Sequence, residues 1–175
     1  MHLNQNLTDP ESFVRLYEQY VERVYAYIVS RVKHVPDAED LTSKIWEIIL
    51  KELPRFKNKE EYSFEAWLFT ICRNEVSHYF KKQGRTQALT DEVAALIPDP
   101  AKTPDQAYQS NESQQEIHTH LAKLSTQQQE CIRLKYLADL KNKEIAAIQG
   151  ISEKTVASNL VRALQNLKKS LQKLQ

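Results

Sequence analysis

The sequence predicts an all-α protein, and its composition and the spacing of its apolar residues are the observations that predict it. Only two of the 175 residues are glycine and six are proline, so few positions favour turns. Apolar residues make up 41% of the chain, enough to form a core. In most segments they recur every three or four positions, which is typical of amphipathic helices. The length suits one ordinary domain or two small ones.

Three long helices are predicted in the first half, where they would form a compact bundle. The first follows a capping Asp9 and covers about 10–32, with apolar residues at helical spacing. The second begins at Asp37, after a proline that breaks the pattern, and ends before the next proline. The third covers about 64–83 and is stopped by Gly84.

Charge divides the chain into three segments. Residues 1–85 carry 13 basic and 13 acidic side chains, residues 86–115 carry one and five, and residues 116–175 carry ten and five. The middle segment also holds three prolines and shows little periodicity. We therefore predict a neutral domain over 1–85, a flexible acidic linker over 86–115 and a basic domain over 116–175. A weakly apolar linker of this kind further suggests that the two domains make few contacts with each other.

The basic domain contains two local signatures of helix ends. Ser125 followed three residues later by Gln128 fits a capping box. Further on, the stretch NKEIAAIQGISEKTVASNL (142–160) reads as two helices joined by a short turn. Gly150 can take the positive φ that ends the first of them, and Ser152 can cap the second. Val156 would then fill the angle between the helices, as expected for a helix-turn-helix.

The second helix of this motif has a polar face. At about 100° per residue, Val156, Leu160 and Leu164 fall on one side of it. The residues predicted to lie on or beside the opposite side are Lys154, Thr155, Ser158, Asn159 and Arg162. Arg and Asn can contact guanine and adenine edges bidentately, while Ser and Thr can contact bases or phosphates. The pattern predicts DNA binding, with a helical hairpin that merely exposes a solvated polar face as the alternative.

Several other classes of protein are disfavoured. Cys72 and Cys131 lie far apart without a CxxC, so we expect buried thiols of a reducing compartment and neither a disulfide nor a metal site. His118 and His120 would point apart on a helix and make a poor metal pair. Neither a phosphate-binding glycine loop nor a catalytic triad order is present, so no enzyme activity and no cofactor are expected. Without a signal peptide or a long apolar run, we expect a soluble cytoplasmic protein.

Three segments together point to a family. They are DAEDLTSKIWEIILKELPRF (37–56), FEAWLFTICRNEVSHYFKKQGR (64–85) and, after the linker, LSTQQQECIRLKYLADLKNKEIAAIQGISEKTVASNLVRAL (124–164). In this order and spacing the chain resembles the extracytoplasmic-function group of the sigma-70 family over roughly residues 10–170. The resemblance implies a subunit that binds core RNA polymerase and directs it to promoters. An anti-sigma factor is a common partner in the family, although no residue here identifies one.

The resemblance also implies roles for particular residues. Region 4, at 116–175, would dock on the polymerase flap and read the −35 element, with Ser152 joining the polar face named above. Region 2, within 1–85, would bind the clamp helices through Asp37, Glu39 and Asp40, with Trp46 either a clamp contact or part of the core. Its residues implied for single-stranded −10 DNA are Arg55, Lys57, Asn58, Arg73, Asn74, His78, Tyr79, Lys81, Lys82 and Arg85. Cations and an aromatic face suit unpaired bases, although the loop cations could equally be solvated. Trp67, Phe69 and Phe80 are favoured as core.

Four positions depart from the family pattern. Lys44 replaces an acid, which puts part of the clamp contact in question. Gln149 replaces an apolar residue before the turn, and Ala157 and Asn159 stand where Lys and Arg are common. With fewer phosphate anchors, either the −35 sequence that is read is unusual or binding relies more on the polymerase. A stand-alone helix-turn-helix regulator is the alternative function, and stoichiometric binding to core polymerase without DNA would discriminate against it.

Overall fold

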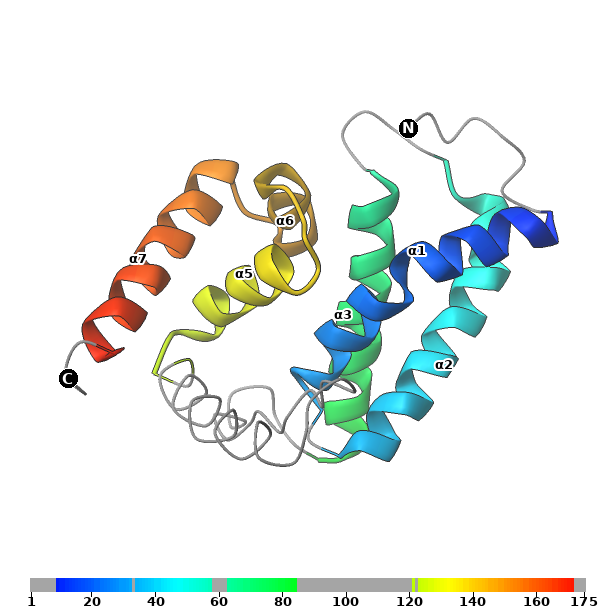
Figure 1. Ribbon diagram of the computed structural model, residues 1–175, viewed down its shortest axis with the longest axis horizontal. Helices are drawn as coiled ribbons and strands as arrows, with labels where there is room; N and C mark the ends of the chain where they lie inside the picture. The colour runs from blue at the N-terminus through cyan, green and yellow to red at the C-terminus, as the bar shows by residue number, and fades with distance from the viewer. Residues whose placement is uncertain (1–8, 33, 58–62, 85–120, 122, 172–175) are drawn as a thin grey trace, which may run out of the picture.

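A computed structural model describes residues 9–32, 34–57, 63–84, 121 and 123–171, and all regular structure within these residues is helical (Figure 1). The elements are α1 (Pro10–Val29), α2 (Val35–Glu52), a 3-10 turn (Leu53–Arg55), α3 (Phe64–Lys82), α5 (Thr126–Tyr136), α6 (Asn142–Gln149) and α7 (Glu153–Leu171). The prediction of an all-α fold is confirmed. The predicted linker over 86–115 lies outside the described residues.

The predicted helix starts follow local capping chemistry, with one difference. Asp9 caps α1 by accepting a hydrogen bond from the backbone N–H of Ser12 at 2.8 Å. Ser63 caps α3 in the same way, accepting from the N–H of Ala66 at 3.2 Å. The second helix begins at Val35 and not at Asp37 as predicted. Pro36 lies in its first turn, where a missing N–H costs nothing because no carbonyl partner precedes it.

The first half packs three helices around an aromatic core. Tyr27 of α1 and Phe69 of α3 are both fully buried and meet edge to face, with ring centroids 5.8 Å apart. Phe64 is also fully buried and packs against Phe56, which follows the 3-10 turn, with ring centroids 5.6 Å apart. Phe80 is 4% exposed. The prediction that Phe69 and Phe80 belong to the core is confirmed.

The second half encloses a smaller core between α5, α6 and α7. Leu134, Ile145 and Val156, one from each helix, are all fully buried. The predicted capping box is present: Ser125 Oγ accepts from the N–H of Gln128 at 3.3 Å, and Gln128 Oε1 accepts from the N–H of Ser125 at 3.2 Å. This box fixes the direction in which α5 leaves the preceding chain.

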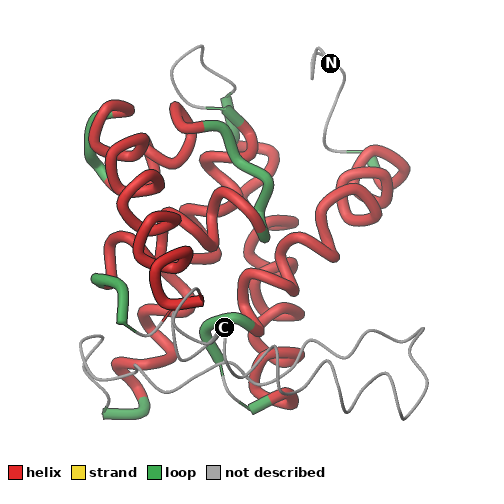
Figure 2. Tube along the Cα trace, turned by 60° about the vertical axis from the view of Figure 1, so that its left-hand side comes forward, coloured by secondary structure: helices red, strands yellow, loops and turns green. Residues whose placement is uncertain are grey.

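The two halves pack directly against each other, so the prediction of few contacts between them is wrong. Helix α6 lies beside α3 (Figures 1 and 2), and the buried apolar cluster continues from one half into the other. Helix α7 lies on the outer side, with α5 and α6 between it and the first half (Figure 1). The prediction failed because it was based on linker composition, which carries no information about the surfaces of the flanking helices.

No helix among the described residues combines the length and the apolar character that crossing a membrane requires.

The capping box provides a test of the boundary of α5. Ser125→Ala should lower the free energy of unfolding by about 1 kcal/mol, because the N–H of Gln128 loses its acceptor at the helix start. Thr126→Ala, which removes a hydroxyl from the exposed next position, is the control and should change stability less. Urea denaturation followed by circular dichroism measures both. Equal losses in the two variants would contradict a specific cap.

Candidate nucleic-acid interface

The turn between α6 and α7 has the geometry of a helix-turn-helix. Gly150 is left-handed, with φ 66° and ψ 35°, and the N–H of Ile151 donates to the carbonyl of Ala146 at 3.1 Å. Ser152 Oγ accepts from the N–H of Thr155 at 3.1 Å and thereby caps α7. Val156 is fully buried in the angle between the helices. The predicted roles of Gly150, Ser152 and Val156 are confirmed.

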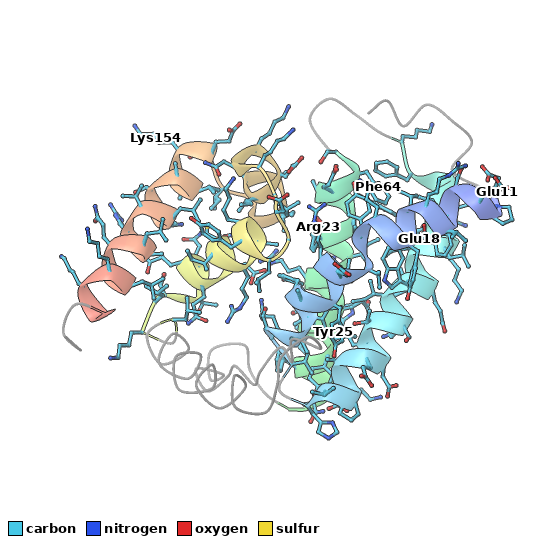
Figure 3. The ribbon with its side chains drawn as sticks, viewed as in Figure 1. Glu11, Glu18, Arg23, Tyr25, Phe64 and Lys154 are labelled. Atoms are coloured by element: carbon cyan, nitrogen blue, oxygen red, sulfur yellow. The ribbon has the colours of Figure 1, made fainter. Side chains whose placement is uncertain are left out.

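The outer side of α7 presents a smaller polar set than predicted. Lys154, Thr155 and Arg162 are exposed and Ser158 is half-buried, and we call these four residues the recognition face. Lys154 stands at the outer corner of the molecule, at the start of α7 (Figure 3). Ser152 is exposed, but its hydroxyl is engaged in the cap.

Asn159 does not belong to this face, and the prediction that it does is wrong. The residue is only 8% exposed and lies against Cys131 of α5, whereas Leu164, predicted to be buried, is 44% exposed. The buried stripe of α7 is therefore rotated toward Asn159 and Ala163, away from Leu164. Asn159 lies about 60° from Val156, which is at the edge of the predicted apolar stripe, and a residue this near the edge can fall on either side of the true boundary.

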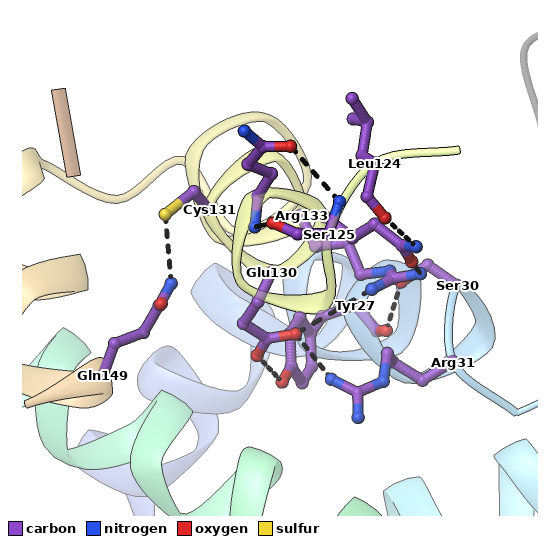
Figure 4. A network of polar contacts seen from close by, with 11 residues as sticks. Tyr27, Ser30, Arg31, Leu124, Ser125, Glu130, Cys131, Arg133 and Gln149 are labelled. Atoms are coloured by element: carbon purple, nitrogen blue, oxygen red, sulfur yellow. Dashed lines mark hydrogen bonds and ion pairs between the residues drawn. The ribbon is translucent and has the colours of Figure 1, made fainter. Parts of the chain in front are cut away.

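Gln149 finds a partner inside the second half. Its amide lies 3.3 Å from the Sγ atom of Cys131 (Figure 4). Burial raises the pKa of the Cys131 thiol, while the contacts from Gln149 and Asn159 oppose that rise. A polar residue is tolerated next to the turn because it is only half-buried and one amide N–H donates to the thiol.

Helix α3 carries the second polar surface. Its exposed members, which we call the α3 face, are Asn74, His78, Lys81 and Lys82. Arg55 and Lys57 after α2 are also exposed, and Arg55 pairs with Glu52 at 3.2 Å. Asn58 and Arg85 lie outside the described residues. The structure thus brings together four of the ten residues predicted for −10 DNA along one helix.

Two further residues predicted for −10 DNA are engaged within the protein. Arg73 is half-buried and donates to the carbonyl of Ile148, at the end of α6, at 3.1 Å. The hydroxyl of Tyr79 donates to Asp37 Oδ2 at 2.7 Å and ties α3 to the start of α2. This hydrogen bond lowers the pKa of the Asp37 carboxyl, and nearby His34 lowers it further. In this conformation Tyr79 is held as a structural contact.

Comparison with known proteins decides the family. The family model described as Sigma-70 region 2 matches residues 16–86, and the model described as Sigma-70, region 4 matches residues 114–167. The ECF RNA polymerase sigma factor BldN of Streptomyces coelicolor is 32% identical over 163 residues, which cover 93% of this chain and 61% of BldN. The chain belongs to the extracytoplasmic-function group of the sigma-70 family.

Other members agree in sequence and in fold. The ECF RNA polymerase sigma factor SigM of Bacillus subtilis is 28% identical over 154 residues, covering 87% of this chain and 91% of SigM. The sigma factor RpoE of Bartonella quintana, crystallised with the anti-sigma factor NepR, has a TM-score of 0.70 and 25% identity, and the match covers 93% of this chain and 98% of RpoE. The chain is thus an RNA polymerase sigma factor, and the relatives it resembles are transcription initiation factors rather than classical enzymes.

The start of α2 in region 2 offers acidic side chains to solvent. Glu39 and Asp40 are exposed, while Asp37 is half-buried by its contacts with Tyr79 and His34. Lys44, one turn further on, pairs with Glu75 of α3 at 2.7 Å. The departure at Lys44 therefore joins α2 to α3.

Trp46 is a core residue. It is 6% exposed and packs against Phe13 and Tyr17 of α1, with centroid distances of 6.1 and 4.9 Å. Of the two alternatives for Trp46, the structure favours the bundle core over a surface contact with polymerase.

A buried polar network joins region 2 to region 4. Glu130 of α5 is 6% exposed, and its carboxylate accepts from the Tyr27 hydroxyl at 2.6 Å and pairs with the Arg31 guanidinium (Figure 4). We call these three residues the Glu130 cluster. Burial and the nearby carboxylate raise the pKa of Tyr27, so the phenol remains a donor. Burial works against the charge of Arg31, but Glu130 outweighs it and raises the pKa of that guanidinium.

The Glu130 cluster was not found by sequence reasoning. Tyr27 fits the apolar spacing of α1 and so looks like an ordinary core residue. The pattern of α5 alone does not indicate whether Glu130 is exposed or buried. The one relevant sequence feature is an acidic residue beside Cys131 and Leu134, which are buried on the same helix. This feature does not indicate that Tyr27 and Arg31 are its partners.

The turn residue Gly150 provides a test of the motif. Gly150→Ala should lower the free energy of unfolding by about 1–2 kcal/mol, because an L side chain is strained in the left-handed region. An added Cβ would meet no atom within 4 Å, so the cost arises from φ alone. Gly150→Asn should lose less, because Asn tolerates this conformation better than Ala. Chemical denaturation measures both variants, and a larger loss for Asn would contradict the explanation.

Proposed function

We propose that this chain binds core RNA polymerase and directs it to promoters by reading a double-stranded −35 element with α7 and holding the single-stranded −10 element with α3. The observation that carries the proposal is the recognition face. It consists of exposed cationic and hydroxyl side chains on a helix whose start is fixed by the Gly150 turn and the Ser152 cap. Both matched regions of the family support the same function.

In this proposal the recognition face lies in the major groove, which is wide enough to admit an α-helix. The first turns of a recognition helix approach the bases most closely, and Lys154 and Thr155 stand there. Arg162, two turns later and exposed, can contact a guanine edge bidentately or a nearby phosphate. Ser158, between them, can contact a base or the backbone.

The α3 face would hold the melted −10 strand and so favour promoter opening. Lys81 and Lys82 can follow the phosphates, while Asn74 and His78 can donate to bases. Arg55, the last residue of the 3-10 turn, and Lys57, just past it, are exposed and would lie at the other end of the same path. Arg73 would join this set once α6 no longer occupies it.

Polymerase contacts are proposed for both regions. Glu39 and Asp40 would meet the clamp helices of the large subunit, and region 4 would dock on the flap.

We propose the boundaries 1–85, 86–115 and 116–175 for the two domains and their linker. An anti-sigma factor is a proposed partner because the structurally similar RpoE was crystallised with one. With these partners, the chain described here would act in the cytoplasm, where core polymerase is found.

The domain boundaries can be tested by limited proteolysis of the whole chain. Cleavage should occur first between residues 85 and 116, because this acidic, proline-containing stretch has little apolar periodicity to support a packed helix. Mass spectrometry of the fragments over time measures the order of cleavage. Early cuts inside 1–85 or 116–175, with the middle segment intact, would contradict the division.

Base readout by α7 can be tested with reconstituted holoenzyme on a randomised −35 library. Arg162→Ala should relax preference at one −35 position, since a bidentate base contact contributes about 1–3 kcal/mol of discrimination. Lys169→Ala is the matched control: it removes one exposed cation from the same helix, about two turns further on. Losing a phosphate contact would weaken all sequences alike, so Lys169→Ala should leave base preferences unchanged.

Sequencing the transcripts from the library gives the base preferences of each variant. The same preferences in Arg162→Ala as in the unmodified protein would remove Arg162 from base readout. Failure of the unmodified chain to bind core polymerase stoichiometrically would contradict the proposed function as a whole.

A further inference from the structure

The side of α7 that packs against α5 contains one polar residue. Among the described side chains of this helix, the buried ones are Val156, Asn159, Leu160 and Ala163. Burying a polar group without all of its hydrogen bonds costs free energy, so the burial of the Asn159 amide is unfavourable in itself. Asn159 is nevertheless only 8% exposed, and its Nδ2 atom has no hydrogen-bond partner in the described part of the chain. The apolar packing of α7 therefore holds this amide in place.

Cys131 of α5 is the residue that Asn159 lies against. Its thiol is fully buried, and Gln149 at the end of α6 donates to the sulfur at 3.3 Å (Figure 4). Gln149 and Asn159 both oppose the rise in the pKa of the thiol that burial causes, which places both amides beside the same sulfur. The end of α6 and the second turn of α7 are thus positioned against one point of α5, on either side of the turn of the motif.

The burial of Asn159 reflects the rotation of α7 about its own axis. Leu164, on the opposite edge of the same side, is 44% exposed. At about 100° per residue, the centre of the buried side lies about 35° from where it would lie if Leu164 were buried in place of Asn159. A helix with its side chains is about 10–12 Å across, so a rotation of about 35° moves the tip of a surface side chain by about 3 Å.

A movement of about 3 Å is large on the scale of base recognition. Successive base pairs are about 3.4 Å apart along the duplex, and an N–H···O hydrogen bond spans about 2.7–3.2 Å between its heavy atoms. A side chain displaced by about 3 Å therefore leaves one base edge for a different group. The residues of the recognition face lie on the same helix as Asn159, so a rotation would move all of them together.

We propose that Asn159 is a specificity-determining residue for the −35 element that does not itself contact DNA. It is a positioning residue: a short, uncharged side chain at this edge of α7 packs against Cys131, and this packing sets the rotation at which the recognition face enters the major groove. Arg162 and the other residues of that face make the contacts with DNA. The inference rests on the proposed function of α7 in reading the −35 element.

Asn159→Leu separates positioning from direct contact with a base. Leucine has the branched shape of asparagine, and an apolar side chain favours the buried position. Holoenzyme containing Asn159→Leu should therefore keep the base preferences of the unmodified protein on the randomised −35 library. The same variant should unfold at a higher urea concentration, because the unpaired buried N–H is gone. Loss of a direct base contact would instead relax the preference at one position.

Asn159→Asp keeps the same shape and adds a charge. A buried carboxylate without a partner is strongly unfavourable, so this edge of α7 should turn toward solvent while Leu164 turns inward. The base preferences should then change at adjacent −35 positions together. Asn166→Asp is the matched control, since it makes the same substitution about two turns further along α7 at an exposed position. Its added charge should weaken binding to all sequences alike and leave the preferences unchanged.

The rotation can be measured without DNA by maleimide labelling of Leu164→Cys in the full chain. The native thiols Cys72 and Cys131 are buried and burial raises the pKa of both, so labelling reports the introduced cysteine. Labelling should be fast in the otherwise unmodified protein, with Asn159→Leu and with Asn166→Asp. It should be severalfold slower with Asn159→Asp, because cysteine is well accommodated in a buried position.

Two results would overturn the positioning role. One is a relaxed preference at a single −35 position in Asn159→Leu while labelling stays fast, which indicates a direct base contact. The other is an Asn159→Asp variant that folds by circular dichroism but changes neither the labelling rate nor the base preferences. If Asn159→Asp does not fold, Asn159→Leu decides alone, and unchanged preferences support the proposal.

Failure of the proposed function would give a different result. Holoenzyme made with the unmodified chain would then initiate from no promoter in the library. The labelling rates, which require neither DNA nor polymerase, would still report the rotation of α7 and its dependence on the side chain at position 159.

Discussion

The buried carboxylate of Glu130 is the constraint on which the arrangement of the two regions depends. Moving an ionised carboxylate out of water costs several kcal/mol, even after the protein relaxes around it. Glu130 tolerates burial because Tyr27 and Arg31 stand against it, and both belong to the other region. A small rotation of one region would therefore leave a charge unpaired. The interaction favours a fully docked or a fully separated molecule over intermediate arrangements.

The remaining polar contacts across the boundary suit a junction that can separate. Arg23 and Arg73 donate to backbone carbonyls at the ends of helices, where the last carbonyls have no partner within the helix. Water can replace an arginine at such a carbonyl, so separation would leave no buried acceptor unsatisfied. The apolar cluster that continues between the regions supplies attraction, while these contacts set the direction of docking.

Features that depend on one turn of chain could be predicted from the sequence. The Asp9 cap, the Ser125–Gln128 box and the left-handed Gly150 each follow from residues within four positions of one another. The recognition face was predicted apart from its boundary. Asn159 was misplaced because the rotation of α7 about its axis is set by packing against α5, which the periodicity of a single helix does not contain.

Features that depend on a partner distant in sequence could not be predicted in this way. Lys44 and Gln149 departed from the family pattern, and each has a partner elsewhere in the fold, Glu75 and Cys131 respectively. The docking of the two regions belongs to the same class, since Tyr27 and Glu130 are separated by 103 positions. One sequence without aligned relatives offers no means of pairing such residues.

The outward position of α7 sets an order of events. In the docked molecule Lys154 and Arg162 are already exposed to solvent, and the helix that carries them, α7, is separated from region 2 by α5 and α6 (Figure 1). Duplex DNA can therefore meet the recognition face without any movement inside the protein, whereas an unpaired strand can reach Arg73 only after α6 has left. Under the proposed function, contact with duplex DNA and contact with an unpaired strand through Arg73 are then separate steps, and only the second requires α6 to move away from α3.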